Sequence, residues 1–333
     1  MRCLTLAREF SALGAEVKFF CREVEGDLNY FIKKQGYDVL TYEATVPVGK
    51  TEARWSLEAQ NYDAQVLAGH IDEKVDWIVV DHYGLDEHWE RAVRGVCKKL
   101  LCIDDLANRM HDCDFLLDQN GECPGGKNYT DKLSRRAVKL IGPQYALLNN
   151  QFKVWRDKRR LREGRVDHVL VFMGSGDLYN STQYALQGLI NSGFKGSIDV
   201  VLGSSNRHSK LLEHICKHIH RARIHVQVDN MAELMHKADL SLGAAGATTW
   251  ERACLGLPTL AVTLAQNQVP IAQYAASHGL LFWLGDHGVI NADDWAQAIR
   301  SVLDGPELCR QMSINGASLV DGNGVARVMK VLI

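Results

Sequence analysis

The sequence is dominated by short apolar runs rich in valine, isoleucine and leucine, most of which end at an aspartate, a glycine or a serine. Amphipathic segments of helical length separate many of them, as at 57–68, 211–220, 231–238 and 295–303. Apolar strands that alternate with helices are typical of a parallel sheet covered on both faces. We therefore predict an α/β fold with strands at 17–21, 77–80, 100–103, 115–117, 169–172, 198–202, 224–228, 240–242 and 260–264.

A length of 333 residues predicts two domains of roughly 150 residues each. Residues 151–165 interrupt the alternation of strands and helices and contain seven basic residues against two acidic ones. We predict an N-terminal domain at 1–150, a linker at 151–165 and a C-terminal domain at 166–333. The basic run fits either a solvated linker or helix face, or a patch that binds nucleic acid. The net charge of −2 favours the solvated segment, because it provides no general positive field.

The composition, 46% hydrophobic and 23% charged, is that of a globular protein. No run approaches the roughly 18 consecutive apolar residues that a membrane span requires, and no signal peptide opens the chain. The nine cysteines are scattered without a C-x-x-C pair. This pattern favours reduced thiols in a cytoplasmic protein, and it lacks the clustered ligands of a zinc site. We expect no metal, no cofactor, no membrane span and no nucleic-acid partner.

Three loops of the C-terminal half follow predicted strands and carry small or amide residues. The first contains Gly174 and Ser175 and precedes a predicted helix, so it fits either an anion-binding loop or a tight turn. The second contains Gly246, Ala247, Thr248 and Thr249 and leads into a helix that carries Glu251. Glu251 fits either a helix cap or an acceptor for a ribose diol. The third contains Asn267 and Gln268, whose amides fit either sugar recognition or ordinary loop chemistry.

The N-terminal half has polar strand ends of its own. Residues 80–84, VDHYG, place His82 and Tyr83 after a strand, and His82 fits either a general base or a structural histidine. Asp104 and Asp105 follow the next strand, where two adjacent carboxylates are a weak metal signal. The chain opens with a helical pattern, MRCLTLAREFSALG, before its first strand. Because a doubly wound domain normally begins with a strand and a ligand-binding loop, we expect a late start that leaves this domain without its first strand.

Taken together, these motifs resemble a known family. The segment 228–275, which includes GAAGATTWERACLGLPTL, is similar to the nucleotide-sugar half of GT-B-type glycosyltransferases. The motifs VDHYG, IDDLANRMHDCDFLLDQN, GPQYALLNNQF and RCLTLAREF resemble the UDP-2,4-diacetamido-2,4,6-trideoxy-β-L-altropyranose hydrolases of pseudaminic acid biosynthesis, the PseG family. The resemblance covers nearly the whole chain and implies two Rossmann-like domains that face a cleft.

The resemblance also implies roles for individual residues. Backbone at Val228 would contact the uracil, and Glu251 would bind the ribose. The loops with Gly174 and Ser175, and with Gly246, Ala247, Thr248 and Thr249, would hold the phosphates. Asn267 would face the sugar with Gln268 beside it, and Tyr83 would reach the sugar from the other domain.

The implied reaction is hydrolysis of the UDP-linked diacetamido-trideoxyhexose to the free sugar and UDP, with this UDP-sugar as the small-molecule partner. The family's G-x-G-H loop, whose histidine activates water, would precede MRCLTLA, so the general base is absent from the chain and we expect impaired turnover. The alternatives are a GT-B UDP-sugar glycosyltransferase, a non-catalytic UDP-sugar-binding protein and a UDP-sugar epimerase of the same fold.

Overall fold

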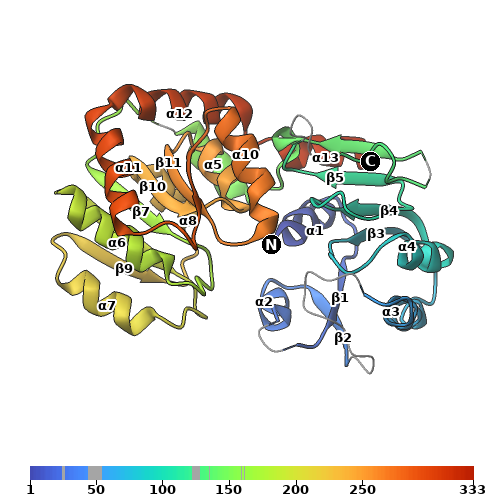
Figure 1. Ribbon diagram of the computed structural model, residues 1–333. Helices are drawn as coiled ribbons and strands as arrows, with labels where there is room; N and C mark the ends of the chain where they lie inside the picture. The colour runs from blue at the N-terminus through green and yellow to red at the C-terminus, as the bar shows by residue number, and fades with distance from the viewer. Residues whose placement is uncertain (25–26, 44–54, 122–127, 135, 159, 161) are drawn as a thin grey trace. The chain divides into compact units, whose positions relative to one another are not determined.

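The chain forms two compact units in this computed structural model, Met1–Leu147 with Val325–Ile333 as unit 1 and Leu148–Gly324 as unit 2 (Figure 1). The structure describes residues 1–24, 27–43, 55–121, 128–134, 136–158, 160 and 162–333. Within them no helix is long and apolar enough to cross a membrane. The eight cysteines in these ranges are free thiols, and Cys123 lies outside them.

Unit 2 contains one parallel sheet of six strands in the order β12-β11-β10-β7-β8-β9. The strands are β7 (His168–Phe172), β8 (Ser197–Leu202), β9 (Ala222–Val226), β10 (Leu240–Ala244), β11 (Thr259–Thr263) and β12 (Phe282–Asp286). The chain adds strands outward from β7 on one side and from β10 on the other, so the order reverses between these two strands. This is the doubly wound arrangement that the apolar runs predict.

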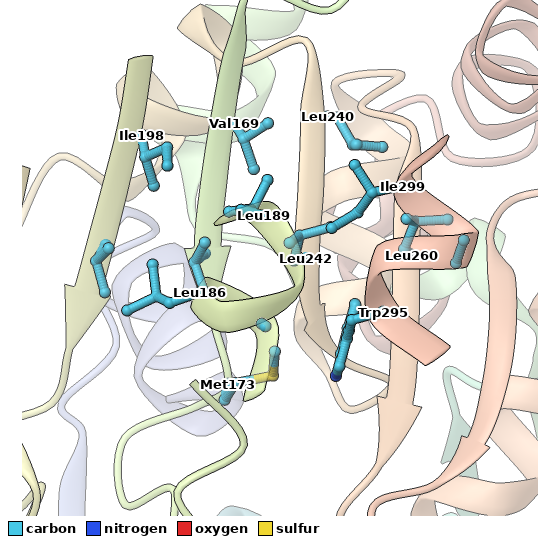
Figure 2. Close-up of a cluster of buried hydrophobic side chains, with 14 of the residues drawn as sticks. Val169, Met173, Leu186, Leu189, Ile198, Leu240, Leu242, Leu260, Trp295 and Ile299 are labelled. Atoms are coloured by element: carbon cyan, nitrogen blue, oxygen red, sulfur yellow. The ribbon is translucent and has the colours of Figure 1, made fainter. Parts of the chain in front are cut away.

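Helices connect the strands of unit 2 and bury both faces of the sheet (Figure 1). They are α5 (Asn150–Asp157), α6 (Ser181–Ser192), α7 (Ser209–Lys217), α8 (Met231–Lys237), α9 (Thr248–Cys254), α10 (Val269–Ser277), α11 (Ala292–Asp304) and α12 (Pro306–Leu319), with the short η3 (Gln266–Gln268). Every residue of β10 and β11 is buried. Figure 2 shows the core on one face, where Leu186, Trp295 and Ile299 of the helices pack on Val169 and Leu242 of the strands.

Unit 1 contains two separate parallel sheets, β1-β2 and β3-β4-β5-β6. The strands are β1 (Lys18–Arg22), β2 (Asp38–Tyr42), β3 (Val75–Val80), β4 (Cys97–Ile103), β5 (Phe115–Asp118) and β6 (Val138–Ile141). The helices are α1 (Arg2–Ala12), α2 (Asn29–Lys34), α3 (Leu57–Gly69), α4 (Glu87–Val93) and α13 (Gly324–Leu332), with η1 (Arg94–Val96) and η2 (Pro143–Tyr145). Among the described residues, β1 and β3 each pair with a strand on one side only.

The prediction that the C-terminal domain runs to residue 333 is wrong, because α13 belongs to unit 1. Val328, Met329 and Leu332 of this helix are buried in a core with Leu6 of α1 and Leu101 of β4. The apolar positions of α13 recur every three or four residues, so one face of the helix is buried against this core.

The interpretation of 151–165 as a solvated linker or helix face holds only in part, since Lys153, Lys158 and Arg165 are exposed but Arg156 and Arg162 are not; residues 159 and 161 lie outside the described ranges. Residues 150–157 form α5, whose Arg156 donates to the carbonyls of Cys254, Ala317 and Val320. Arg162 is only 4% exposed and donates to five carbonyls near the ends of α8 and α9. These basic side chains therefore satisfy the free carbonyls at helix C-termini instead of facing water.

Candidate functional site

The candidate site lies at the carboxyl edge of the unit 2 sheet, where the strand order reverses. Phe172 at the end of β7 pairs with Gly243 of β10, and Ala244 of β10 pairs with Val262 of β11. The three loops that follow these strands are therefore neighbours, and they are the loops that carry Ser175, Gly246 and Gln268. A reversal of strand order opens a crevice outside the strand ends, where doubly wound folds bind ligands.

The loop after β10 is built from residues too small to fill this crevice. A Cβ added to Gly243 would lie 2.2 Å from Nη1 of Arg252 and 2.7 Å from the carbonyl oxygen of Phe172, so only glycine fits there. Ala247 is exposed and precedes α9 without a side-chain cap, and Thr248 is half-buried. Thr249 is buried and its Oγ1 lies 3.4 Å from Arg252, so this hydroxyl faces the interior and not the crevice.

The loop after β11 carries two amide side chains, Asn267 and Gln268. Gln268 accepts a hydrogen bond from the backbone N–H of Leu264 through Oε1 at 2.9 Å, which fixes the side chain. Its Nε2 lies 3.5 Å from where a Cβ on Gly246 would be. The Oδ1 of Asn267 is buried and has no hydrogen-bond partner among the described residues. The fixed Gln268 donor and the free Asn267 acceptor give this loop polar groups that a ligand can use.

The loop after β7 differs from the sequence-based prediction in one respect. Gly174 has φ +93°, and a Cβ on Gly203 would lie 2.2 Å from the carbonyl oxygen of Ser175, so this loop lies directly against the end of β8. Asp177 is 4% exposed and accepts hydrogen bonds from the backbone N–H groups of Ser181 and Thr182 at 2.8 and 3.0 Å. The start of α6 therefore already holds a carboxylate, which leaves the backbone at Gly174 and Ser175 as the part of this loop that an anion could use.

Glu251 and Arg252 follow each other in α9. Burial raises the pKa of Glu251 to about 7, although the positive charge of Arg252 opposes the shift. Burial lowers the pKa of Arg252 to about 10, and the negative charge of Glu251 opposes that shift. Glu251 thus changes its charge near neutral pH, which a carboxylate bonded only to water does not do.

Val228 lies at the same edge but away from the crevice. It follows β9, the outermost strand, and β8 and β7 lie between β9 and β10. Three strand spacings amount to about 14 Å. The structure therefore brings the loops with Gly174, Ser175, Gly246 and Gln268 together where the strand order reverses and places Val228 at the far end of the edge.

Tyr83 belongs to unit 1, where it follows β3 in a hydrogen-bonded group of charges. Arg2 donates to both carboxylate oxygens of Asp81 at 2.8 and 2.7 Å and to Asp105 at 3.1 Å. Burial raises the pKa of Tyr83 well above its usual value, and the charge of Asp105 and a hydrogen bond to it add to the shift. Burial and the nearby charge of Arg109 lower the pKa of His82 to about 4, so this imidazole is neutral and a weak base.

Sequence reasoning missed a buried charge cluster in unit 1. Ligand atoms of Glu90, Cys102 and His111 lie within 4.8 Å of one another. Nδ1 of His111 is 2.7 Å from Glu90 and 3.3 Å from the Cys102 sulfur, and Asp104 pairs with Arg109 at 2.8 Å. Burial disfavours the imidazolium, but hydrogen bonds to Asp104 and Glu90 raise the pKa of His111 to about 9. The cluster is thus a buried ion-pair network. Its members Cys102, Asp104, Arg109 and His111 lie close together in sequence, but only the fold brings Glu90 of α4 to them.

The comparisons with known proteins define the class of fold first. The MurG structure from Acinetobacter baumannii is 14% identical, with a TM-score of 0.67 over 99% of this chain and 94% of that one. LpCGTa in complex with UDP is 13% identical, with a TM-score of 0.65 over 99% of this chain and 94% of that one. A glycosyltransferase from Rickettsia africae gives a TM-score of 0.57 at 12% identity over 99% of this chain and 93% of that one. The chain has the two-domain α/β fold of GT-B glycosyltransferases.

The sequence relatives are more specific. The UDP-2,4-diacetamido-2,4,6-trideoxy-β-L-altropyranose hydrolase of Campylobacter jejuni is 25% identical over 84% of this chain and 90% of that protein. The spore coat polysaccharide biosynthesis protein SpsG of Bacillus subtilis is 25% identical over 57% of each chain. An uncharacterized protein of Methanocaldococcus jannaschii is 26% identical over 80% of this chain, and the match spans about half of that protein, 52% of its length. No family model matches the chain. The chain is therefore similar to the Campylobacter hydrolase, as its motifs indicate.

Proposed function

We propose that this protein hydrolyses a UDP-linked diacetamido-trideoxyhexose, UDP-2,4-diacetamido-2,4,6-trideoxy-β-L-altropyranose, to the free sugar and UDP. The similarity to the Campylobacter hydrolase over most of both chains supports the substrate class. The observation that carries the proposal is the meeting of three loops of small and amide residues where the unit 2 strand order reverses. A nucleoside diphosphate bound along that edge would extend from Val228 to Gly246, and the strand spacing of about 14 Å suits its length.

Each group at the edge has a role in this proposal. Backbone N–H groups of the loop with Gly246, Ala247 and Thr248 hold the diphosphate, together with the backbone at Gly174 and Ser175. Because Asp177 occupies the start of α6, most of the charge stabilisation falls to the loop after β10.

The remaining polar groups of the site bind the ribose and the sugar. Glu251 accepts two hydrogen bonds from the ribose diol when it is ionised. Asn267 and Gln268 bind the acetamido groups of the sugar, whose N–H and C=O match a free Oδ1 and a free Nε2. Tyr83 of unit 1, which its raised pKa keeps protonated throughout the neutral range, stays a prediction of the resemblance as a residue that reaches the sugar.

The reaction breaks the bond between the anomeric carbon and the β-phosphate oxygen. Water attacks the anomeric carbon, its proton passes to a base, and UDP leaves with the bonding electron pair. A preorganised hydrogen-bond donor aimed at such developing charge is worth about 3 kcal/mol in other enzymes. A general base contributes about 10²- to 10⁴-fold in rate. The pKa of His82, lowered to about 4, makes it a weak base, so we do not assign it this role.

Two measurements test the proposal. Calorimetry with UDP tests binding at unit 2, and UDP release from the UDP-sugar without any acceptor tests hydrolysis. Binding with acceptor-independent release of UDP supports the hydrolase. Release only after an acceptor is added favours a glycosyltransferase, which the fold also fits, and an altered hexose still linked to UDP indicates an epimerase. Tight binding without any turnover indicates a binding protein, and failure to bind UDP rejects the proposed site.

A further inference from the structure

Arg252 lies beneath the loop after β10 in unit 2. It is 1% exposed, and its Nη2 donates to the carbonyl oxygen of Ala244 at 2.6 Å and approaches Oγ1 of Thr249 at 3.4 Å. Nη1 fills the space that a side chain on Gly243 would need, at 2.2 Å from the position of its Cβ. The guanidinium therefore lies against the backbone at the point where the sheet order reverses.

The guanidinium of Arg252 is incompletely satisfied. Its Nε and Nη1 are buried and have no hydrogen-bond partner in the described part of the chain. Arg162 is a contrast within the same unit, since its Nε, Nη1 and Nη2 all donate to carbonyl oxygens. A buried donor without a partner is costly, so two such donors on one cation suggest that an acceptor is missing.

The charge of Arg252 is also poorly balanced. Among the described residues, no carboxylate forms an ion pair with it within 4.0 Å, whereas Arg2 of unit 1 contacts both Asp81 and Asp105. The nearest acidic neighbour in sequence is Glu251, whose pKa of about 7 leaves it only partly ionised at neutral pH. A buried charge is normally paired, so this cation lacks the partner that its burial calls for.

We propose that Arg252 is a positioning residue whose buried positive charge, fixed beneath the loop with Gly246, is balanced by the diphosphate of the ligand. The inference deepens the proposed function and rests on it. Arg252 acts in two ways: its bond to Ala244 holds the turn that presents the backbone N–H groups, and its charge favours a polyanion above that turn. The second effect grows with the charge of the ligand, which a purely structural role does not explain.

The experiment compares the affinities of uridine, UMP and UDP in the full chain by calorimetry, for wild type, R252Q, R252K and R162Q. R252Q removes the charge and R252K keeps it. We expect R252Q to weaken the binding of UDP by about 10- to 100-fold, that of UMP by a smaller factor, and that of uridine by under about threefold. R252K should keep the wild-type ratio of uridine to UDP dissociation constants within about threefold. R162Q is the matched control, because it removes a buried guanidinium that does not contact the loop with Gly246. Its ratio of uridine to UDP dissociation constants should equal that of wild type.

The ratio separates the possible results. If R252Q weakens uridine and UDP by the same factor, or leaves UDP affinity unchanged, the inference is wrong. If thermal unfolding shows that R252Q does not fold, R252K is the deciding variant. A ratio of uridine to UDP dissociation constants near that of wild type supports the role of charge. A fall in this ratio by more than about tenfold contradicts it. If the wild-type chain does not bind UDP, the proposed function fails before this inference is tested.

Discussion

At the scale of single residues, polar groups in or beside the predicted ligand loops serve the fold instead. Asp177 caps α6, and Thr249 turns its hydroxyl toward Arg252. The type and position of these residues are visible in the sequence, but the direction of each side chain depends on neighbours from distant strands. The charge on Glu251 likewise depends on burial, which no local motif reveals.

Glu251 should make nucleoside binding dependent on pH. The ribose diol binds the carboxylate, and the free carboxyl has a pKa of about 7, so affinity should fall as the pH drops through 7. We expect uridine to bind about tenfold more weakly near pH 5.5 than near pH 8.5, measured by calorimetry. Uridine is used because it carries no phosphate that titrates in this range. E251Q is the control and should bind weakly at both pH values; a wild-type affinity independent of pH would contradict the ribose role.

The same carboxyl should cost stability when it is ionised. Its pKa in the folded protein is raised above the unfolded value of 4.5, so its contribution is favourable below pH 4.5 and is lost as the pH rises through 7. E251Q removes this loss, and we expect it to be more stable than wild type at pH 8 by up to about 3 kcal/mol. Urea denaturation at pH 8 and pH 5 measures the difference, which should shrink at the lower pH.

Asp177 should stabilise α6 without contributing to ligand binding. D177A removes two hydrogen bonds to backbone N–H groups and should lower the free energy of unfolding by about 1–2 kcal/mol. D177N is the intermediate variant: its amide keeps one acceptor oxygen where the carboxylate has two, so it should lose less stability than D177A. Chemical denaturation measures the free energies of unfolding, and calorimetry should show that D177A does not weaken UDP binding. A large loss of UDP affinity in D177A would mean that the carboxylate organises the phosphate loop.

At the scale of elements, the strands that the sequence predicts include the most deeply buried ones. The apolar runs located strands such as β10 and β11, whose residues are all buried. They missed β2, β6 and β12, each of which is the last strand of its sheet and is partly exposed. The edge strands β1 and β9 are exposed to a similar extent and were predicted, and β12 overlaps the apolar run at 280–284, so edge exposure alone does not explain which strands were missed.

The unpaired edges of β1 and β3 should also affect local stability. Each strand has a neighbour on one side only among the described residues, whereas β7 lies between β10 and β8. Amides that form no interstrand hydrogen bond exchange faster with solvent. We expect hydrogen–deuterium exchange in peptides covering Lys18–Arg22 to be faster than in peptides covering His168–Phe172. Equal protection of both would show that something else covers the edge of β1.

At the scale of the whole molecule, the chain passes from unit 1 to unit 2 and back again. The first crossing follows Leu147 and the second follows Gly324. The amphipathic pattern of the last helix is visible in the sequence, but the pattern does not say which core it joins. Only the packing of Val328 and Met329 against α1 and β4 shows that α13 completes unit 1.

A substitution in α13 should therefore destabilise unit 1 and spare the site of unit 2. Val328 is fully buried, and V328A should lower the free energy of unfolding by about 1–3 kcal/mol. V331A is the matched control on the same helix, because Val331 is 40% exposed. This substitution should change the free energy of unfolding by under about 0.5 kcal/mol. Denaturation curves measure both, and the UDP dissociation constant should be the same in all three proteins. A V328A protein with weakened UDP binding would contradict this separation.

The return of the last nine residues to the first unit limits how the molecule can be dissected. A single cut near residue 148 yields no autonomous pair of fragments, because the amino-terminal piece loses a helix and the carboxy-terminal piece keeps it as an unpaired apolar tail. Separate production of unit 1 requires a short loop that grafts 325–333 directly onto Leu147. For the same reason, a purification tag at Ile333 is attached to unit 1 and reports on its integrity.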